Sequence, residues 1–270
     1  MSEPAVLYEK SDGIAVVTMN RPEVRNAINP EMLCRLADAW QDINDDVEVR
    51  VAILTGAGDK AFCAGADLDR LVRMMQGLRP PENDFDERIK NDYTIIYKGL
   101  LRNYQVTKPI IAAIRGFCVA GGTEILSTTD IRIAGDDARF GLAEVKWSLF
   151  PMGGSTVRLP RQISYCNAME ILLTGEQFSA ERALQMGLIN KVVPPNQVMP
   201  DARRYAAILN ANGPLAVQAV KRSVVTTFDL PMEQALEKEM EIGVPVSMSE
   251  DCREGTKAFK EKRKPVFKGR

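Results

Sequence analysis

The stretch of residues 110–126, IIAAIRGFCVAGGTEIL, contains the pattern that decides the fold. Its first five residues are a short apolar run between a proline and a glycine, which predicts a buried strand over Ile110–Ile114. Gly121-Gly122 then permits a close approach of the backbone, and a helical segment follows. Similar apolar runs at Val51–Thr55 and Ile131–Ala134 are separated from this strand by helical stretches. The alternation predicts an α/β protein whose sheet is at least partly buried on both faces.

The residues before these strands add a hairpin and a helix. Ala5–Glu9 and Ile14–Met19 flank Ser11-Asp12-Gly13, a sequence typical of a β-hairpin. Asn29-Pro30 then caps and starts a helix whose apolar residues fall on one stripe. The N-terminal part is therefore expected to add two strands and one helix to the same core.

After about residue 180 the strand signals mostly stop. The remaining pattern predicts helices over residues 180–187, 200–212, 214–227, 231–248 and 250–262. The chain therefore divides into an α/β core of residues 1–195 and a helical C-terminal region of residues 196–270. Within the core, Gly77–Asn83 has the composition of an exposed loop, and one helix is expected to carry the apolar residues from Ile89 to Tyr104.

Length and charge exclude several classes of protein. The chain has 270 residues, enough for one large domain or for a core with an appendage. Lys+Arg is 35 and Asp+Glu is 36, so the net charge of -1 gives no global attraction to nucleic acid or to an anionic membrane. The N-terminus lacks the apolar segment of a secretory signal, and no apolar run approaches the roughly 18 residues of a membrane span. We therefore expect a cytoplasmic protein that has neither nucleic acid nor membrane as a partner.

The sequence contains no histidine, and this limits the available chemistry. Ser-His-Asp and Cys-His catalysis and zinc sites with histidine ligands are excluded. The five cysteines form no Cys-x-x-Cys pair, which argues against a disulfide framework or a zinc knuckle and fits a reducing compartment. Proton transfer near neutral pH is left to carboxylates, Lys, Tyr, Cys or water, and we expect no metal site.

Three glycine-rich segments follow apolar strands, at residues 55–67, 115–126 and 140–155. The carboxyl ends of strands are where an open α/β sheet binds ligands. The first segment imitates a dinucleotide-binding fingerprint at Gly56-x-Gly58-x-x-Ala61. That fingerprint needs a helix to begin at once, whereas this loop continues to a helix start capped by Asp67. Backbone N–H groups near such a start are unpaired and available to an anion.

The second and third segments each contain an isolated acid in apolar surroundings, Glu124 and Glu144. Glu124 has an alternative interpretation as a buried partner of Arg132 or Arg139, and Glu144 as a solvated loop acid. Taken together, the segments provide free backbone donors and two isolated carboxylates. Such donors can hold a developing enolate oxygen while carboxylates move protons, so the set favours chemistry next to a carbonyl group.

These positions carry a resemblance to a known family. From about Ala15 to Phe267 the chain resembles the crotonase superfamily, specifically its enoyl-CoA hydratase/isomerase group. The matching motifs are, in order, Met19-Asn20-Arg21-Pro22, Asn26-Ala27, Ala64-Gly65-Ala66-Asp67-Leu68, Gly121-Gly122-Thr123-Glu124, Phe140-Gly141-Leu142-Ala143-Glu144, Leu159-Pro160-Arg161, Ala183 with Gly187-Leu188, and Glu254-Gly255 through Lys262-Arg263-Lys264. The resemblance implies a crotonase-like core of repeated ββα units. It also implies a helical C-terminal region involved in trimerisation, with trimers often paired into hexamers.

The resemblance further implies an acyl-CoA thioester substrate of fatty acid metabolism, with no cofactor beyond the coenzyme A that the substrate carries. The backbone N–H groups of Ala66 and Gly121 would form the oxyanion hole. Glu124 would deprotonate a water that attacks C3, and protonated Glu144 would deliver a proton to C2 of a trans-2-enoyl-CoA. Contacts to the substrate or its coenzyme A are assigned to Arg25, Ala27, Lys60, Ala64, Asp67, Leu68, Gly122 and Lys262, the last of these toward a neighbouring subunit.

Other reactions within the family stay open. The chain could be an enoyl-CoA isomerase or a specialised 3-hydroxyacyl-CoA dehydratase, for instance of the carnitinyl-CoA type. Trp147 and Phe150 are bulkier than the small residues common there, which leaves a branched, aromatic or carnitine-type acyl group open. A basic C-terminus, from Lys257 to Arg270, leaves RNA binding as a second alternative, although few aromatic residues are interleaved with it.

Overall fold

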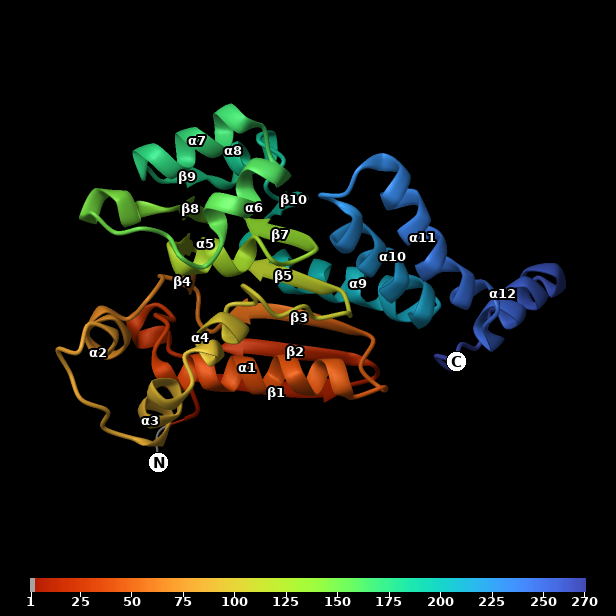
Figure 1. Ribbon diagram of the computed structural model, residues 1–270, viewed down its shortest axis with the longest axis horizontal. Coiled ribbons are helices and arrows are strands. Elements are labelled where there is room, and N and C mark those ends of the chain that lie inside the picture. Colours follow the sequence, from red (N-terminus) through yellow and green to blue (C-terminus); the bar gives the residue numbers. More distant parts are fainter. Residues whose placement is uncertain (1–2) are drawn as a thin grey trace.

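The strands of the chain form two sheets in the computed structural model, which describes residues 3–270 (Figure 1). The larger sheet has the order β1 (Val6–Ser11), β2 (Ile14–Met19), β3 (Val51–Gly56), β5 (Ile110–Ile114), β7 (Ile131–Gly135) and β10 (Lys191–Val193). The smaller sheet has the order β4 (Ala61–Cys63), β6 (Phe117–Val119), β8 (Arg139–Gly141) and β9 (Phe178–Ser179). Neighbouring strands run parallel except at β1–β2 and β8–β9.

The two sheets are linked by a repeated unit. After each of the strands β3, β5 and β7 of the larger sheet, the chain passes directly into a short strand of the smaller sheet. These short strands are β4, β6 and β8, in that order. After β6 the chain enters helix α5 (Gly121–Leu126). This arrangement confirms the expected α/β fold with ββα units. The short strands were not anticipated, because each spans only three residues next to glycines and shows no alternation of its own.

The N-terminal hairpin and helix are confirmed. Asp12 and Gly13 have φ values of 49° and 77°, the left-handed pair that a tight two-residue hairpin turn requires. Helix α1 (Pro30–Asp45) begins where Asn29 accepts a hydrogen bond from Met32 N.

Helices cover both faces of the larger sheet. On β3, Ala52 and Leu54 face the core on the α1 side, whereas Val51 and Ile53 face α9 (Val198–Ala211). Side chains alternate between the two faces of a strand, and both faces of this strand are covered by helices. Its residues are therefore apolar at successive positions. The alternation explains why an unbroken apolar run predicted it correctly.

The segment between β4 and β5 differs from the prediction of a single helix over Ile89–Tyr104. The structure has two helices here, α3 (Asp84–Asn91) and α4 (Thr94–Gly99). They are separated because Asp92 takes an extended conformation and its carboxylate accepts hydrogen bonds from the backbone and hydroxyl of Thr94. Before them lie the short helices η2 (Leu68–Val72) and α2 (Arg73–Met75).

The remaining helices follow β8. They are η3 (Ala143–Trp147), α6 (Ser155–Gln162), α7 (Tyr165–Thr174), α8 (Ala180–Gln185), α10 (Pro214–Thr227), α11 (Met232–Ser247) and α12 (Glu250–Glu261), with the single turn η4 (Pro195–Gln197). Another single turn, η1 (Pro22–Val24), lies between β2 and α1. The five predicted C-terminal helices are present. In Figure 1, α10 to α12 extend away from the sheets, with α12 the most distant. The division of the chain at residue 195 stays a prediction; α9, just beyond it, packs on the sheet. No helix within residues 3–270 is both long and apolar enough to cross a membrane.

Candidate active site

Two glycine-containing loops lie against each other at the carboxyl ends of β4 and β6. These strands are paired, with Cys63 opposite Cys118, so the loops that follow them begin side by side. A Cβ atom built on Gly65 would lie 2.7 Å from the Cβ of Ala120, and one built on Gly121 would lie 3.8 Å from Ala66 N. Only glycine permits this approach at residue 65, where φ is +93°.

The backbone N–H groups of Ala66 and Gly121 are both directed away from regular structure. Ile28 N donates to Gly65 O at 2.8 Å, and the carbonyl and N–H of a trans peptide point in opposite directions. The Ala66 N–H therefore points away from Ile28. Gly121 is the first residue of α5, where an N–H has no acceptor within the helix. Ala120 precedes it with a strained φ of 48° that sets the direction of this peptide.

Glu124 lies on α5, three residues after Gly121, and its side chain is buried. Its Oε1 atom accepts hydrogen bonds from Gly153 N at 2.7 Å and from Ser155 Oγ at 3.0 Å. Burial raises the pKa of Glu124, while these donors act to lower it. Both donors use the same oxygen, which leaves Oε2 for another partner.

The alternative pairing of Glu124 with a nearby arginine is wrong. Arg132 donates to Leu188 O, to Thr129 and to Gln162. Arg139 donates to the carbonyls of its own turn. Glu124 is instead held by neutral donors from the segment that opens α6.

Glu144 lies in η3, directly after β8, and is half-buried. Its buried Oε2 atom has no hydrogen-bond partner among the described residues. Burial, with a smaller contribution from the charge of Glu124, raises the pKa of Glu144 to about 7. The alternative of an ordinary solvated acid therefore does not hold. A carboxyl group poised near neutrality beside a second one is suited to proton transfer.

The residues assigned to coenzyme A contacts fall into two groups. Arg25, Ala27, Ala64 and Leu68 lie on or beside the loop that follows β4, where Ala64 N donates to Arg25 O at 3.0 Å, whereas Lys60 directly precedes β4. Lys262 caps the far end of α12, which Figure 1 places well apart from that loop within one chain. Gly122 packs α5 on β4, since a Cβ there would lie 2.5 Å from Cys63 O.

Three residues of the site were missed in the sequence. Gly153 and Ser155 were recognised only as the start of a helix, although both bind Glu124 from about thirty residues away along the chain. Arg21 was noted only as part of a motif, yet its Nη1 lies 2.9 Å from Asp67 Oδ2. Nothing in local spacing connects such distant positions.

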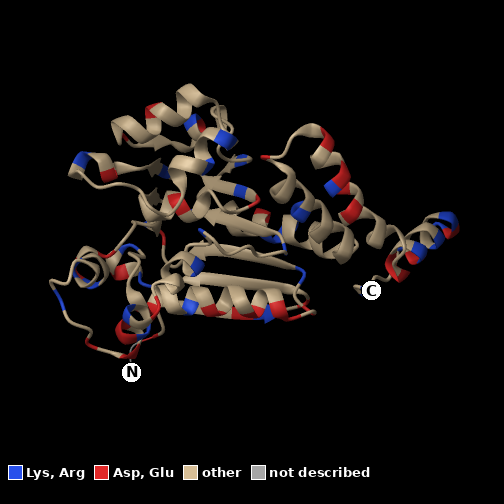
Figure 2. Ribbon diagram, in the orientation of Figure 1, with Lys and Arg blue, Asp and Glu red and all other residues tan. Residues whose placement is uncertain are grey.

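Three acidic residues of α12 pair with arginines that follow the helix. Figure 2 shows acidic and basic residues interleaved along this helix. Arg263 donates to both carboxylate oxygens of Glu254, at 2.6 and 2.8 Å, and Arg270 pairs with Glu250 at 3.1 Å. These contacts reduce the positive charge that an RNA-binding surface would need.

Comparison with known proteins gives concordant results. A family model described as enoyl-CoA hydratase/isomerase matches residues 9–270. Enoyl-CoA hydratase EchA19 of Mycobacterium tuberculosis is 46% identical, covering 100% of this chain and 98% of its own length. (E)-benzylidenesuccinyl-CoA hydratase of Thauera aromatica is 40% identical, covering 98% and 99%. A crystal structure of an enoyl-CoA hydratase from M. tuberculosis H37Rv superimposes with a TM-score of 0.88 at 39% identity, covering 99% of this chain and all of the other.

Proposed function

Because this chain belongs to the enoyl-CoA hydratase/isomerase family, we propose that it is an enoyl-CoA hydratase, a hydro-lyase that adds water reversibly across the C2=C3 bond of a trans-2-enoyl-CoA. The observation that carries this proposal is the pair Glu124 and Glu144. Glu124 is buried and Glu144 is half-buried, and burial raises the pKa of both carboxyl groups. A hydration needs one group to remove a proton from water and another to supply one.

The thioester oxygen lies between the N–H groups of Ala66 and Gly121. Negative charge develops on this oxygen as water adds at C3, and a preorganised donor of this kind is typically worth roughly 3 to 4 kcal/mol. The position of Gly121 at a helix N-terminus adds a favourable dipole. The two donors thus stabilise the enolate without moving during the reaction.

Glu124 is the base and Glu144 the acid in this mechanism. Glu124 is fixed through Oε1, so Oε2 is free to take a proton from the attacking water. The buried oxygen of Glu144 has no donor in the described part of the chain, and the pKa of Glu144 is about 7, which favours a protonated group that can supply a proton to C2. The separation of the two environments accounts for the division of roles.

The coenzyme A moiety follows the loop after β4. Arg25, whose guanidinium carbon lies 5.4 Å from the Phe117 ring centre, and Lys60 provide positive charge for its phosphates. Ala27, Ala64 and Leu68 offer backbone or apolar contacts on the same edge, and Gly122 permits α5 to approach Cys63 at the end of β4. No cofactor beyond the coenzyme A of the substrate is required.

The acyl group is bulky or aromatic in this proposal. Trp147 and Phe150 follow Glu144 closely, and their side chains are 76% and 68% exposed in the single chain. Exposed aromatic residues of this size are characteristic of binding surfaces. The hydratase of T. aromatica, named for benzylidenesuccinyl-CoA, supports an aromatic candidate.

Self-association as a trimer, or as a dimer of trimers, completes the proposal. Exposed apolar residues lie in a stripe at four-residue spacing along one face of α11 and just beyond its C-terminal end. They are Met232, Leu236, Met240, Val244 and Met248. Such a stripe needs a partner surface. Lys262 then contacts coenzyme A bound to a neighbouring subunit. The five unpaired cysteines fit a cytoplasmic, reducing compartment.

A substrate panel tests the proposal. Loss of enoyl-thioester absorbance is measured with crotonyl-CoA, a longer enoyl-CoA and an aromatic enoyl-CoA. We expect hydration, with kcat/KM highest for a bulky substrate. Binding of all three thioesters without hydration would refute the hydratase and favour an isomerase or a specialised dehydratase.

A further inference from the structure

The loop that carries Ala66 is tied to the segment Arg21–Ile28 along its whole length. Backbone hydrogen bonds join Ala64 N to Arg25 O (3.0 Å), Ile28 N to Gly65 O (2.8 Å) and Asp67 N to Ile28 O (2.9 Å). The segment itself is rigid, because fully buried Asn26 accepts from Arg21 N and donates to Ala57 O and Ala61 O. The orientation of the Ala66 peptide therefore depends on this neighbouring segment.

An ion pair closes this arrangement. Arg21 Nη1 donates to Ala27 O at 2.5 Å and to Asp67 Oδ2 at 2.9 Å. The two side chains are only 16% and 14% exposed, so solvent and salt screen the pair less than they would a surface pair. A single guanidinium nitrogen thus connects the segment to the residue after Ala66.

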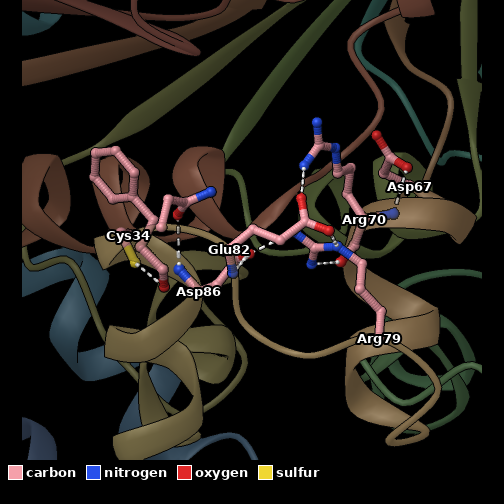
Figure 3. A network of polar contacts seen from close by, with 8 residues as sticks. Cys34, Asp67, Arg70, Arg79, Glu82 and Asp86 are labelled. Carbon is pink, nitrogen blue, oxygen red and sulfur yellow. Dashed lines mark hydrogen bonds and ion pairs between the residues drawn. The ribbon is translucent and has the colours of Figure 1, made fainter.

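The second oxygen of Asp67 is also occupied. Asp67 Oδ1 accepts from Arg70 N at 2.9 Å and so caps η2, as Figure 3 shows. Arg70 in turn pairs with Glu82, which Arg79 also contacts together with buried Asp86. With both oxygens bound within the protein, the Asp67 carboxylate is part of the support of the loop.

From these contacts we infer that Arg21 and Asp67 are a pair of positioning residues, which aim the Ala66 N–H at the thioester oxygen without touching the substrate. The inference rests on the proposed function, since it gives the Ala66 N–H the role of an oxyanion donor. It assigns Asp67 a supporting role in place of the substrate contact that the family resemblance implies. Small misplacement of a catalytic group costs up to about 100-fold in rate, so the pair matters for kcat.

The test compares wild-type protein with Arg21→Met, Asp67→Asn, the double variant and Arg21→Lys. Lys10→Met is the matched control, because Lys10 pairs with Asp42 and Asp46 at the opposite end of α1. We measure kcat and KM for crotonyl-CoA. We also measure the absorbance shift of bound cinnamoyl-CoA, whose red shift reports polarisation of the thioester carbonyl.

In both single variants we expect kcat to fall about 10- to 100-fold, KM to change little and the red shift to decrease. The double variant should be no worse than either single one, since residues of one pair are not additive. Arg21→Lys keeps the charge and should recover part of both signals. Lys10→Met should match the wild type.

Three results would overturn the inference: an undiminished kcat and red shift in Arg21→Met, fully additive effects in the double variant, or a fall in kcat with an unchanged red shift. Failure of the proposed function looks different. In that case the wild type hydrates no enoyl-CoA, yet the red shift of bound cinnamoyl-CoA still responds to Arg21→Met.

Discussion

Glu144 has a buried carboxylate oxygen that receives no hydrogen bond from residues 3–270, whereas one oxygen of Glu124 accepts two. The two acids therefore differ in environment although both come from glycine-rich segments. Desolvation favours the neutral acid, and hydrogen bonds to the carboxylate favour the charged form. In the proposed mechanism, this difference at the scale of single residues allows one acid and one base to operate at the same pH.

The raised pKa of Glu144 should make the free energy of unfolding depend on pH. The folded protein raises this pKa from 4.5 to about 7, so the folded state binds the proton more tightly than the unfolded chain. Its contribution to stability is fully present below about pH 4.5 and is lost as the pH rises through about 7. Relative to Glu144→Gln, the wild type should lose about 2 to 3 kcal/mol in free energy of unfolding across this window.

Urea unfolding at pH 5 and pH 8 measures this difference. Glu87→Gln, on the exposed face of α3, is the control and should follow the wild type. A difference between Glu144→Gln and wild type that stays constant with pH would contradict the assignment.

Ser155 should tune the base. Its hydroxyl stabilises the charged form of Glu124, and a hydrogen bond to a charged group is worth roughly 1.5 to 3 kcal/mol. Ser155→Ala should therefore move the acidic limb of kcat/KM upward by about one pH unit. The charges of Glu144 and Arg102 also influence the protonation of Glu124. The apparent pKa of the acidic limb therefore describes these interacting residues together.

Ser164→Ala is the control for this experiment. Ser164 caps α7, so its loss should lower stability by about 1 kcal/mol without moving the acidic limb. An unshifted limb in Ser155→Ala would show that Ser155 does not control the protonation of Glu124.

At the scale of elements, the site is assembled where short strands end and helices begin. The loop after β4 and the turn before α5 interlock through Gly65 and Ala120, and the segment before α6 closes over Glu124 through Gly153. Each contact leaves no room for a Cβ atom. The geometry of the site therefore depends on glycines as much as on the acids.

Gly153→Ala tests this dependence. A Cβ at residue 153 would lie 2.6 Å from Glu124 Oε2, so the carboxylate must move. We expect kcat to fall by about 100-fold while the protein stays folded by circular dichroism. Gly243→Ala, in α11 with no atom within 4 Å of the added Cβ, should retain activity. Near wild-type kcat in Gly153→Ala would contradict a fixed Glu124.

The elements that could be predicted from the sequence are those with a pattern of their own. The long strand at residues 110–114 is fully buried, and its apolar run suffices to predict it. β6 has three residues and is held by its neighbours β4 and β8, which no local pattern reports. The prediction of one helix over Ile89–Tyr104 was wrong because the helical spacing of apolar residues continues across Asp92, where the structure has a turn.

The same distinction applies to the candidate site. Glu124 and Glu144 could be found because isolated acids among apolar residues are conspicuous. Their donors could not, since Ser155 meets Glu124 only through the tertiary fold. Similarly, the contact of Arg21 with Asp67 spans 46 positions of the chain.

At the scale of the whole molecule, the C-terminal helices leave a large apolar surface on the outside. Val220 and Val224 on α10 are exposed, as is the stripe on α11. A surface of this kind is characteristic of an interface between subunits.

Charge placed on this surface should prevent assembly. We expect Val220→Glu combined with Met240→Glu to convert the proposed trimer or hexamer to monomers, as measured by light scattering after size-exclusion chromatography. Val47→Glu is the control, because Val47 is a single residue, 84% exposed, outside this surface. A wild-type protein that is monomeric at micromolar concentration would contradict the proposed assembly.

The central claim is that two glutamates cooperate in adding water to an enoyl-CoA. It is tested most directly by the rate of crotonyl-CoA hydration at pH 7 for wild type, Glu124→Gln and Glu144→Gln. The account requires rapid hydration by the wild type and a fall of at least about 100-fold in both folded variants. Wild-type rates in either variant would contradict the claim.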